Sequence, residues 1–542
     1  MKHTPPPSHP SLPALALACS LAVLMLSSCP QPGPELPAIE GVGTATFDLS
    51  SQSVLHLDFM NYEALDVTLV DPPRGTLYLG KSNISSAAVA AGSTGFSSQS
   101  EKGTPPQNHG FLMDKDREAS RLASLPKGAR SASPKAASIP FGDPPSNYIV
   151  DSTTRDFWIE SKGVWKSVGA TLRYISHTAY LWIPDGYYKE SELIAAPTDN
   201  RLTKNQINAL GDAFSGSDPW TGSGIRALIS NLYGTEWGGE PGGSGGIDGD
   251  QHIHILLYDL EEDYDSAQTG GLLGYFWPWD EYSATYAETY KERSNEAQMF
   301  YLDVHLADRF PGTMRSTLAH EYQHMIYEEY KNSIGDTWFN EMLSMLGEEF
   351  VESYVQDALD PYSVRERLET FKPNYYASGV TDWLRDDPLK SYASAYAFGA
   401  YLARNYGRVR LLRALGWSVK AGKAAIDEVL DDLGYPKDFD AVVADYISAF
   451  VLKNPAPAGG YSFPAAGGTL DGVSYSVPGF SLPDANGAAL KIFAPGEQGA
   501  LRPYGQSLHS ASSWKDPRDG KVVRVTRPGT ESVSLALVFS RQ

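Results

Sequence analysis

The feature that most constrains this chain is the motif His-Glu-x-x-His at residues 320–324. In an α-helix, residues four apart lie on one face, so His320 and His324 can direct their imidazoles at a single point. Glu321 lies beside that point. Two neutral nitrogen ligands and an adjacent carboxylate suit a hydrolytic zinc site, because the carboxylate can take a proton from the attacking water. The motif therefore predicts a metal-binding helix.

The residues around the motif favour a helix. The stretch 311–313, Pro-Gly-Thr, is typical of a helix start. After it, Met314, Leu318, Met325 and Ile326 recur at roughly helical spacing, which indicates a buried stripe. The alternative is an ordinary amphipathic helix that carries the motif by coincidence.

A third metal ligand is expected further along the chain, because a catalytic zinc takes three protein ligands and leaves one position for water. Glu341 stands at the head of the apolar run 342–346. A glutamate that faces inward from such a run is costly unless it is paired or bound to metal. Glu341 is therefore the predicted third ligand. Glu348 and Glu349 are the alternatives, and we expect them at the solvated end of the same helix.

With Asn340 and Glu341 after the first motif, the chain resembles the gluzincin metallopeptidases, and most of all the hyicolysin family. The stretches that carry this resemblance are 316–326 and 338–341, with 179–183, 246–250, 252–259 and 295–301 upstream. Two features depart from thermolysin-like gluzincins. The spacing to the third ligand is shorter, and Met345 stands where those enzymes carry an aspartate that supports a zinc histidine. The partner of that histidine is therefore unassigned.

The resemblance implies an α+β fold, with a zincin-type catalytic domain made of a mostly antiparallel sheet subdomain and a helical subdomain. In zincins an edge strand pairs with extended substrate backbone, and the stretch 298–304 is the candidate. Tyr392, with Ala395 three positions later, is similar to the tyrosine that donates a hydrogen bond to the oxyanion in gluzincin aminopeptidases. Tyr396 is the alternative, and packing of both rings in the core is another.

Changes in composition and stretches rich in glycine and proline divide the chain of 542 residues into several parts. Alternating apolar residues predict a small β module at 41–80. The segment 81–145, rich in Ser, Ala, Gly and Pro, reads as a linker or pro-segment. The catalytic domain is expected at 146–453. Short alternating runs between Gly and Pro turns predict a C-terminal β-sandwich module at 460–542.

Residues 1–28 read as a lipoprotein signal peptide, since their apolar core is too short to span a bilayer. The end of this segment, Leu-Ser-Ser followed by Cys29, resembles a bacterial lipobox. Cys29 is then the lipidated first residue, followed by a tether over 29–40; a plain secretory signal is the alternative. Cys19 leaves with the signal, so the mature chain has no cysteine chemistry. The expected location is the bacterial cell envelope, lipid-anchored and extracytoplasmic, or secreted.

The formal net charge of −21 disfavours nucleic-acid partners, because phosphate backbones are repelled. Carboxylates gather between residues 248 and 265, and their oxygens are the ligands that Ca²⁺ takes. A solvated loop is the alternative. The acidic residues of this set are Asp248, Asp250, Asp259, Glu261, Glu262, Asp263 and Asp265.

These observations together predict a surface-anchored zinc endopeptidase acting on protein or peptide substrates. His320, His324 and Glu341 hold Zn²⁺, Glu321 is the general base, and Tyr392 steadies the oxyanion. An endopeptidase is preferred to an aminopeptidase because no G-x-M-E-N-like segment is present for an N-terminal amine. One alternative is a catalytically silent surface binding protein, or adhesin, on a peptidase scaffold, which has no need to keep the general base. The other is a metallohydrolase acting on a non-peptide bond.

Overall fold

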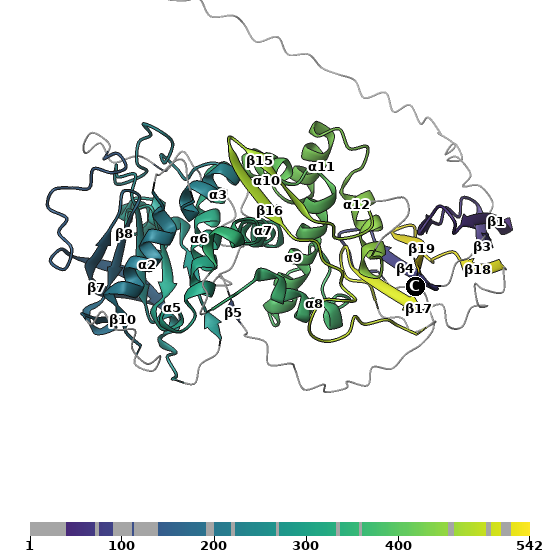
Figure 1. Ribbon diagram of the computed structural model, residues 1–542, viewed down its shortest axis with the longest axis horizontal. Helices are drawn as coiled ribbons and strands as arrows, with labels where there is room; N and C mark the ends of the chain where they lie inside the picture. Colours follow the sequence, from purple (N-terminus) through teal and green to yellow (C-terminus); the bar gives the residue numbers. More distant parts are fainter. Residues whose placement is uncertain are drawn as a thin grey trace, which may run out of the picture.

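The computed structural model describes residues 40–70, 75–89, 111–112, 130, 139–190, 200–217, 223–266, 270–331, 336–356, 360–453, 460–494, 500–510 and 522–541. The predicted signal peptide, Cys29 and most of the 81–145 segment lie outside these ranges. No helix within them is long and apolar enough to cross a membrane. The described chain forms a sheet subdomain, a helical subdomain and a β module, arranged in that order along the long axis of Figure 1.

The sheet subdomain is built on six strands in the order β13-β14-β11-β8-β7-β6. Strand β11 runs parallel to both of its neighbours, whereas the other neighbouring pairs are antiparallel, so the sheet is mostly antiparallel as predicted. The strands are β6 (Thr154–Ser161), β7 (Val164–Ile175), β8 (Ala179–Ile183), β11 (Ile253–Tyr258), β13 (Gly274–Phe276) and β14 (Met299–Asp303).

The edge strand on the helix side is β13, and the prediction that 298–304 forms the edge is wrong. Strand β14 lies between β13 and β11. Its side chains are buried on both faces, with Phe300 packed toward one core and Tyr301 toward the other. A strand without a polar face suits an interior position, whereas the short β13 suits an edge.

Helices cover one face of this sheet. Helices α2 (Lys204–Ser215) and α6 (Pro311–Tyr330) contact the strands, and α3 (Ile225–Tyr233) packs against both helices. Figure 1 shows α6 and α3 beside the strands, on the side that faces the helical subdomain. Alternation along β11 explains the two faces: Ile255 joins the core beneath the helices, and Leu256 joins an aromatic core on the opposite face. Helix α2 opens with a capping box formed by Thr203 and Gln206.

The helical subdomain packs against α6 through α7 (Thr337–Val355). Helix α6 begins with Pro311 in its first turn, as predicted. Behind α7 lie α8 (Arg367–Asn374), α9 (Pro388–Asn405), α10 (Val409–Trp417), α11 (Gly422–Asp432) and α12 (Phe439–Tyr446). One continuous hydrophobic core runs from the sheet through α6 and α7 into these helices, so the two subdomains form a single body.

The terminal β structure is present, but the two segments that the sequence treats as separate modules share their sheets. One sheet has the order β1-β3-β18 and the other β17-β4-β19-β2. Apolar residues of both sheets form one small core. The strands are β1 (Glu40–Asp48), β2 (Val54–His56), β3 (Tyr62–Val70), β4 (Gly75–Asn83), β17 (Gln506–Ser510), β18 (Val522–Thr526) and β19 (Val533–Arg541).

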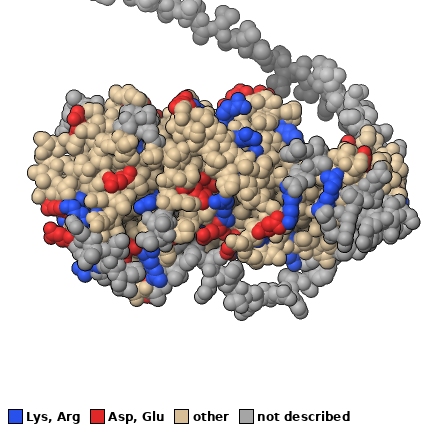
Figure 2. Space-filling model, in the orientation of Figure 1, with Lys and Arg blue, Asp and Glu red and all other residues tan. Residues whose placement is uncertain are grey.

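A hairpin from the predicted C-terminal module lies elsewhere. Strands β15 (Ala466–Leu470) and β16 (Val473–Val477) pair with each other and pack on α10 and α7. The segment after 460 therefore contributes to both the helical subdomain and the β module. On the face drawn in Figure 2, acidic and basic side chains lie mixed in small groups among uncharged ones.

Candidate metal centre and active site

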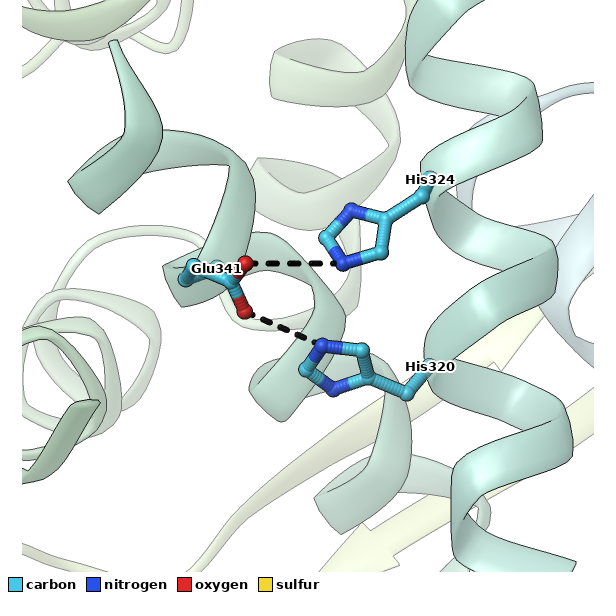
Figure 3. A group of neighbouring side chains, drawn as sticks. All are labelled: His320, His324 and Glu341. Atoms are coloured by element: carbon cyan, nitrogen blue, oxygen red, sulfur yellow. Dashed lines mark hydrogen bonds and ion pairs between the residues drawn. The ribbon is translucent and has the colours of Figure 1, made fainter. Parts of the chain in front are cut away.

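The structure brings His320, His324 and Glu341 together. One ligand atom from each lies within 4.8 Å of the other two, and all three side chains are buried. His320 Nε2 is 3.0 Å from Glu341 Oε2, and His324 Nε2 is 3.6 Å from Glu341 Oε1. Figure 3 shows both imidazoles pointing from α6 toward the carboxylate on α7. The geometry is that of two nitrogens and one carboxylate converging on a single point.

The surroundings of His324 leave the lone pair of its Nε2 available to a metal ion. Ser344 Oγ donates to Gln323 Oε1, so the contact of 3.2 Å between Ser344 Oγ and His324 Nδ1 is best made with Nδ1–H as donor. That tautomer leaves a lone pair on Nε2. This atom is buried and forms no hydrogen bond among the described residues. A buried nitrogen lone pair aimed at a carboxylate fits a metal ligand, because a cation between them would satisfy both.

His320 is held from its other side by Glu348. His320 Nδ1 lies 2.8 Å from Glu348 Oε1, and Ser316 Oγ donates to Glu348 Oε2 at 2.7 Å. A carboxylate in this place accepts the Nδ1 proton and turns Nε2 toward the metal position. Glu348 thus occupies the role left unassigned by Met345 in the sequence.

The expectation that Glu348 and Glu349 lie at a solvated helix end is wrong, because each is only 1% exposed. Glu348 follows Glu341 by seven residues, which is two helical turns, so both face α6. Glu349 faces α9 instead, where its oxygens pair with Arg404 at 2.6 and 2.9 Å. Neither residue joins the group of three ligand atoms. The sequence feature that could have indicated this role of Glu348 is its spacing of seven residues from Glu341, which places both side chains on one face of a helix.

The charges at the centre are compatible with a bound cation. Burial would lower the pKa of His320, but the carboxylates of Glu341 and Glu348 raise it to about 10. Burial lowers the pKa of His324 to about 4, so this imidazole is neutral at pH 7. With its pKa of about 10, His320 carries one positive charge at pH 7, which leaves two buried carboxylates facing a single imidazolium. A divalent cation that displaces the proton of His320 Nε2 compensates both carboxylates. The residues present therefore fit a metal ion.

Glu321 follows His320 on α6 and is fully buried. Helical geometry places it about 100° around the axis from His320, beside the ligand face rather than on it. This is the position that the sequence predicts for the general base.

Tyr392 and Tyr396 both lie on α9, and their surroundings differ. The Tyr396 hydroxyl donates to Glu349 Oε1 at 2.9 Å, within the buried pair that Glu349 makes with Arg404. The ring of Tyr392 lies under the guanidinium of Arg367, with Cζ 4.8 Å from the ring centroid. The hydroxyl of Tyr396 is thus engaged in holding the core, which favours Tyr392 as the candidate oxyanion donor.

Arg367 is a residue of this region that the sequence did not indicate. It stands at the first position of α8. Burial raises the pKa of Glu341, but the two histidines lower it by more, and the positive charge of Arg367 adds to the lowering. A cation beside a candidate metal ligand and a candidate oxyanion donor adds positive potential to this region. No motif links Arg367 to the other residues, because only the fold brings α8 next to α7 and α9.

The structure gives the predicted calcium site no further support. Asp259 and Asp263 approach Asp303 within 4.8 Å. However, Asp303 caps a helix: its Oδ1 accepts from the Leu306 N–H at 2.7 Å and its Oδ2 from the Leu260 N–H at 2.9 Å. Its oxygens are thus engaged with the backbone.

A helix with two histidines and a glutamate, followed by a second helix with the acidic ligand, defines the metal-dependent peptidase class. Residues 185–502 match the family model described as Peptidase M30. The chain belongs to this peptidase family. It is 29% identical over 255 residues to the neutral metalloprotease ShpI of Staphylococcus hyicus, covering 43% of this chain and 47% of that protein. The chain thus spans about half the length of the curated relative that it matches.

Proposed function

We propose that this chain is a zinc-dependent endopeptidase that hydrolyses peptide bonds of extracytoplasmic proteins. The observation that carries the proposal is the convergence of His320, His324 and Glu341 within 4.8 Å. Membership of the Peptidase M30 family and similarity to a neutral metalloprotease support a metal-dependent peptidase. Zinc is the proposed metal because two imidazoles and one carboxylate form its usual catalytic ligand set.

Each residue of the site has a separate role in the proposed hydrolysis. Zinc, when bound, polarises the scissile carbonyl and acidifies the attacking water. Glu321 accepts a proton from that water and delivers it to the leaving amine. Tyr392 donates a hydrogen bond to the oxygen on which negative charge develops. Glu348 holds His320 in the ligating orientation.

The experiment that tests this function compares the wild-type chain with Glu321→Gln on denatured casein. Glutamine keeps the size of the side chain but cannot accept the proton, so cleavage should fall by about 10²–10⁴-fold while bound zinc is retained. Survival of cleavage in Glu321→Gln would remove Glu321 from the role of base. A chain that binds zinc but cleaves no protein, while hydrolysing a non-peptide ester or amide, would favour the other metallohydrolase reading.

The proposal includes attachment to a membrane through lipid on Cys29, because Leu-Ser-Ser-Cys ends an apolar segment of signal-peptide length. Cys29→Ala should move the protein from the membrane fraction to the soluble fraction. Mass spectrometry of the mature N-terminus is the direct measurement. An unmodified N-terminus that begins at another residue would contradict lipidation and leave a plain secretory signal.

A further inference from the structure

Arg130, which precedes the catalytic domain in the chain, is buried against it. Its guanidinium side chain is only 2% exposed. Nη1 lies 2.7 Å from Glu281 Oε2 and 3.1 Å from Glu329 Oε2. Nη2 donates to the Glu328 carbonyl at 2.9 Å and lies 3.5 Å from Glu328 Oε1. A single arginine is therefore met by three carboxylates.

These contacts form a shaped site, which we call the Arg130 socket. It consists of Glu281, Glu328 and Glu329, with the rings of Trp237 and Tyr282 within 5.9 Å of the Arg130 guanidinium carbon. The side chains of Glu281 and Glu328 are 0% and 4% exposed. Carboxylates, a carbonyl and aromatic faces around one plane match a guanidinium better than a lysine ammonium.

The negative charge of the Arg130 socket favours a positively charged side chain within it. Three carboxylates face one guanidinium, and two of these carboxylates are almost completely buried. Removing one partner of a buried ion pair is strongly destabilising, because the remaining charge stays in a poorly solvated place. The socket is therefore built to hold a cationic side chain.

The socket is connected to the active site through α6. Glu328 follows Glu321 by seven residues, so it lies on the same side of the helix two turns further on. Glu281 ends the short helix η4 (Pro278–Glu281), which begins two residues after the edge strand β13. The socket thus joins the end of the active-site helix to the end of the edge strand.

The same part of the chain touches the opposite side of the site. Strand β5 (Phe111–Leu112) pairs in parallel with β12 (Gly271–Leu272), directly before the edge strand β13. Strand β5 also contacts α9, the helix that carries Tyr392. In Figure 1 it lies between the sheet subdomain and helices α8 and α9. Added backbone beside an edge strand is how peptidases of this kind are expected to receive substrate.

We propose that the Arg130 socket is a binding site for an arginine side chain of a polypeptide. Arg130 occupies it in cis, holds β5 between the sheet edge and α9, and thereby keeps the peptidase latent. The latency rests on the function proposed above, whereas the binding site does not. Because Arg130 belongs to the same chain, its effective concentration at the socket is high, and a competing peptide in solution binds only weakly while Arg130 is in place.

The test of binding uses the full chain in a Glu321→Gln background, so that it does not depend on catalysis. The probe is a fluorescent peptide with the sequence of residues 126–134, Pro-Lys-Gly-Ala-Arg-Ser-Ala-Ser-Pro. We expect it to bind Arg130→Ala at least about 30-fold more tightly than the chain that keeps Arg130, as estimated for a lost buried charge partner. A peptide with lysine in place of its arginine should bind more weakly. Equal binding to both chains, or to neither, overturns the site.

Two further variants keep the binding test decisive. Arg130→Ala combined with Glu281→Gln removes one buried charge from the emptied socket, so it should fold better than Arg130→Ala and bind the peptide less tightly. Arg130→Lys keeps the charge but loses the planar fork, and it should admit the peptide to an intermediate degree. Undiminished peptide binding after Glu281→Gln would show that the peptide binds elsewhere, which contradicts the proposal.

The test of latency measures cleavage of casein with Glu321 intact. Arg130→Ala should raise turnover by about tenfold or more, and added 126–134 peptide should lower it again. Turnover equal to wild type, with zinc content unchanged, overturns latency while Glu321→Gln still reports on the proposed function. Absence of cleavage in every variant would contradict both the peptidase function and latency. The peptide-binding experiment would then still test, by itself, whether the Arg130 socket binds arginine.

Discussion

The ring of His320 is contacted on both nitrogens by glutamates of α7: Glu348 Oε1 accepts from Nδ1 at 2.8 Å, and Glu341 Oε2 lies 3.0 Å from Nε2. The two glutamates are two helical turns apart. One face of α7 therefore supplies both a candidate metal ligand and the group that orients another candidate ligand. This arrangement ties the position of His320 to the packing of α6 on α7. The metal centre and the junction of the two subdomains are consequently the same structure.

Glu348→Gln should weaken zinc binding without unfolding the chain. The amide removes the negative charge that holds the Nδ1 proton, and loss of such a partner typically costs about 10–100-fold in metal affinity. Competition with a chromophoric chelator measures the affinity. Ser316→Ala is the matched control, because it removes only the hydroxyl that donates to Glu348 at 2.7 Å, and its effect should be smaller. Equal affinity of Glu348→Gln and wild type would contradict this role.

The purified chain should contain one zinc ion, and His324→Ala should lose it. A ligand that binds only the folded state raises thermal stability, so a chelator should lower the Tm of wild type. The same chelator should leave the Tm of His324→Ala almost unchanged. Metal analysis and differential scanning calorimetry make the comparison. A wild-type chain that folds fully and takes up no zinc after supplementation would contradict the metal centre.

Tyr392→Phe should lower kcat and leave KM nearly unchanged, because a hydrogen bond to the oxyanion matters mainly in the transition state. Loss of one such donor typically costs about 10²–10³-fold in rate. Tyr396→Phe should behave differently, since it removes the hydrogen bond to Glu349 and thus lowers stability by about 1 kcal/mol or more. Steady-state kinetics and denaturant unfolding separate the two effects. A large kcat defect in Tyr396→Phe with unchanged stability would transfer the oxyanion role to that residue.

The sequence predicted the three residues that converge in the structure because they obey local rules. His320 and His324 are one helical turn apart, and Glu341 is a charged residue at the head of an apolar run. The sequence could not predict Arg367, since its place near Glu341 depends on how α8, α7 and α9 pack. Nor did the sequence show which strand lies at the edge of the sheet, because β13 has only three residues, whereas the apolar β14 is the stronger strand signal. Glu348 and Glu349 were misplaced because a glutamate pair normally indicates solvent.

Asp280 should make stability depend on pH. Burial raises the pKa of its carboxyl group to about 7, even though it accepts from the Tyr301 hydroxyl at 2.5 Å and the Asn295 N–H at 2.6 Å. The folded state therefore holds this proton more tightly than the unfolded state does. Its contribution is fully present below about pH 4 and is lost as pH rises through about 7.

Asp280→Asn should remove this dependence. Between about pH 4 and pH 7 the unfolding free energy of wild type should fall relative to that of the variant, by on the order of 4 kcal/mol at most. Urea unfolding at several pH values, in a Glu321→Gln background to prevent self-digestion, gives the difference. Parallel pH curves for the two chains would mean that Asp280 ionises as easily in the folded state as in the unfolded state.

The β module contains strands that lie far apart in the sequence. β19 pairs with both β4 and β2, and β18 pairs with β3, across more than 400 residues of intervening sequence. Strands β1 and β3 can pair with each other early, but β2 and β4 find their hydrogen-bonded neighbours only among β17 and β19. A product that stops before residue 506 should therefore leave the edges of β2 and β4 unpaired and open to proteases and chaperones.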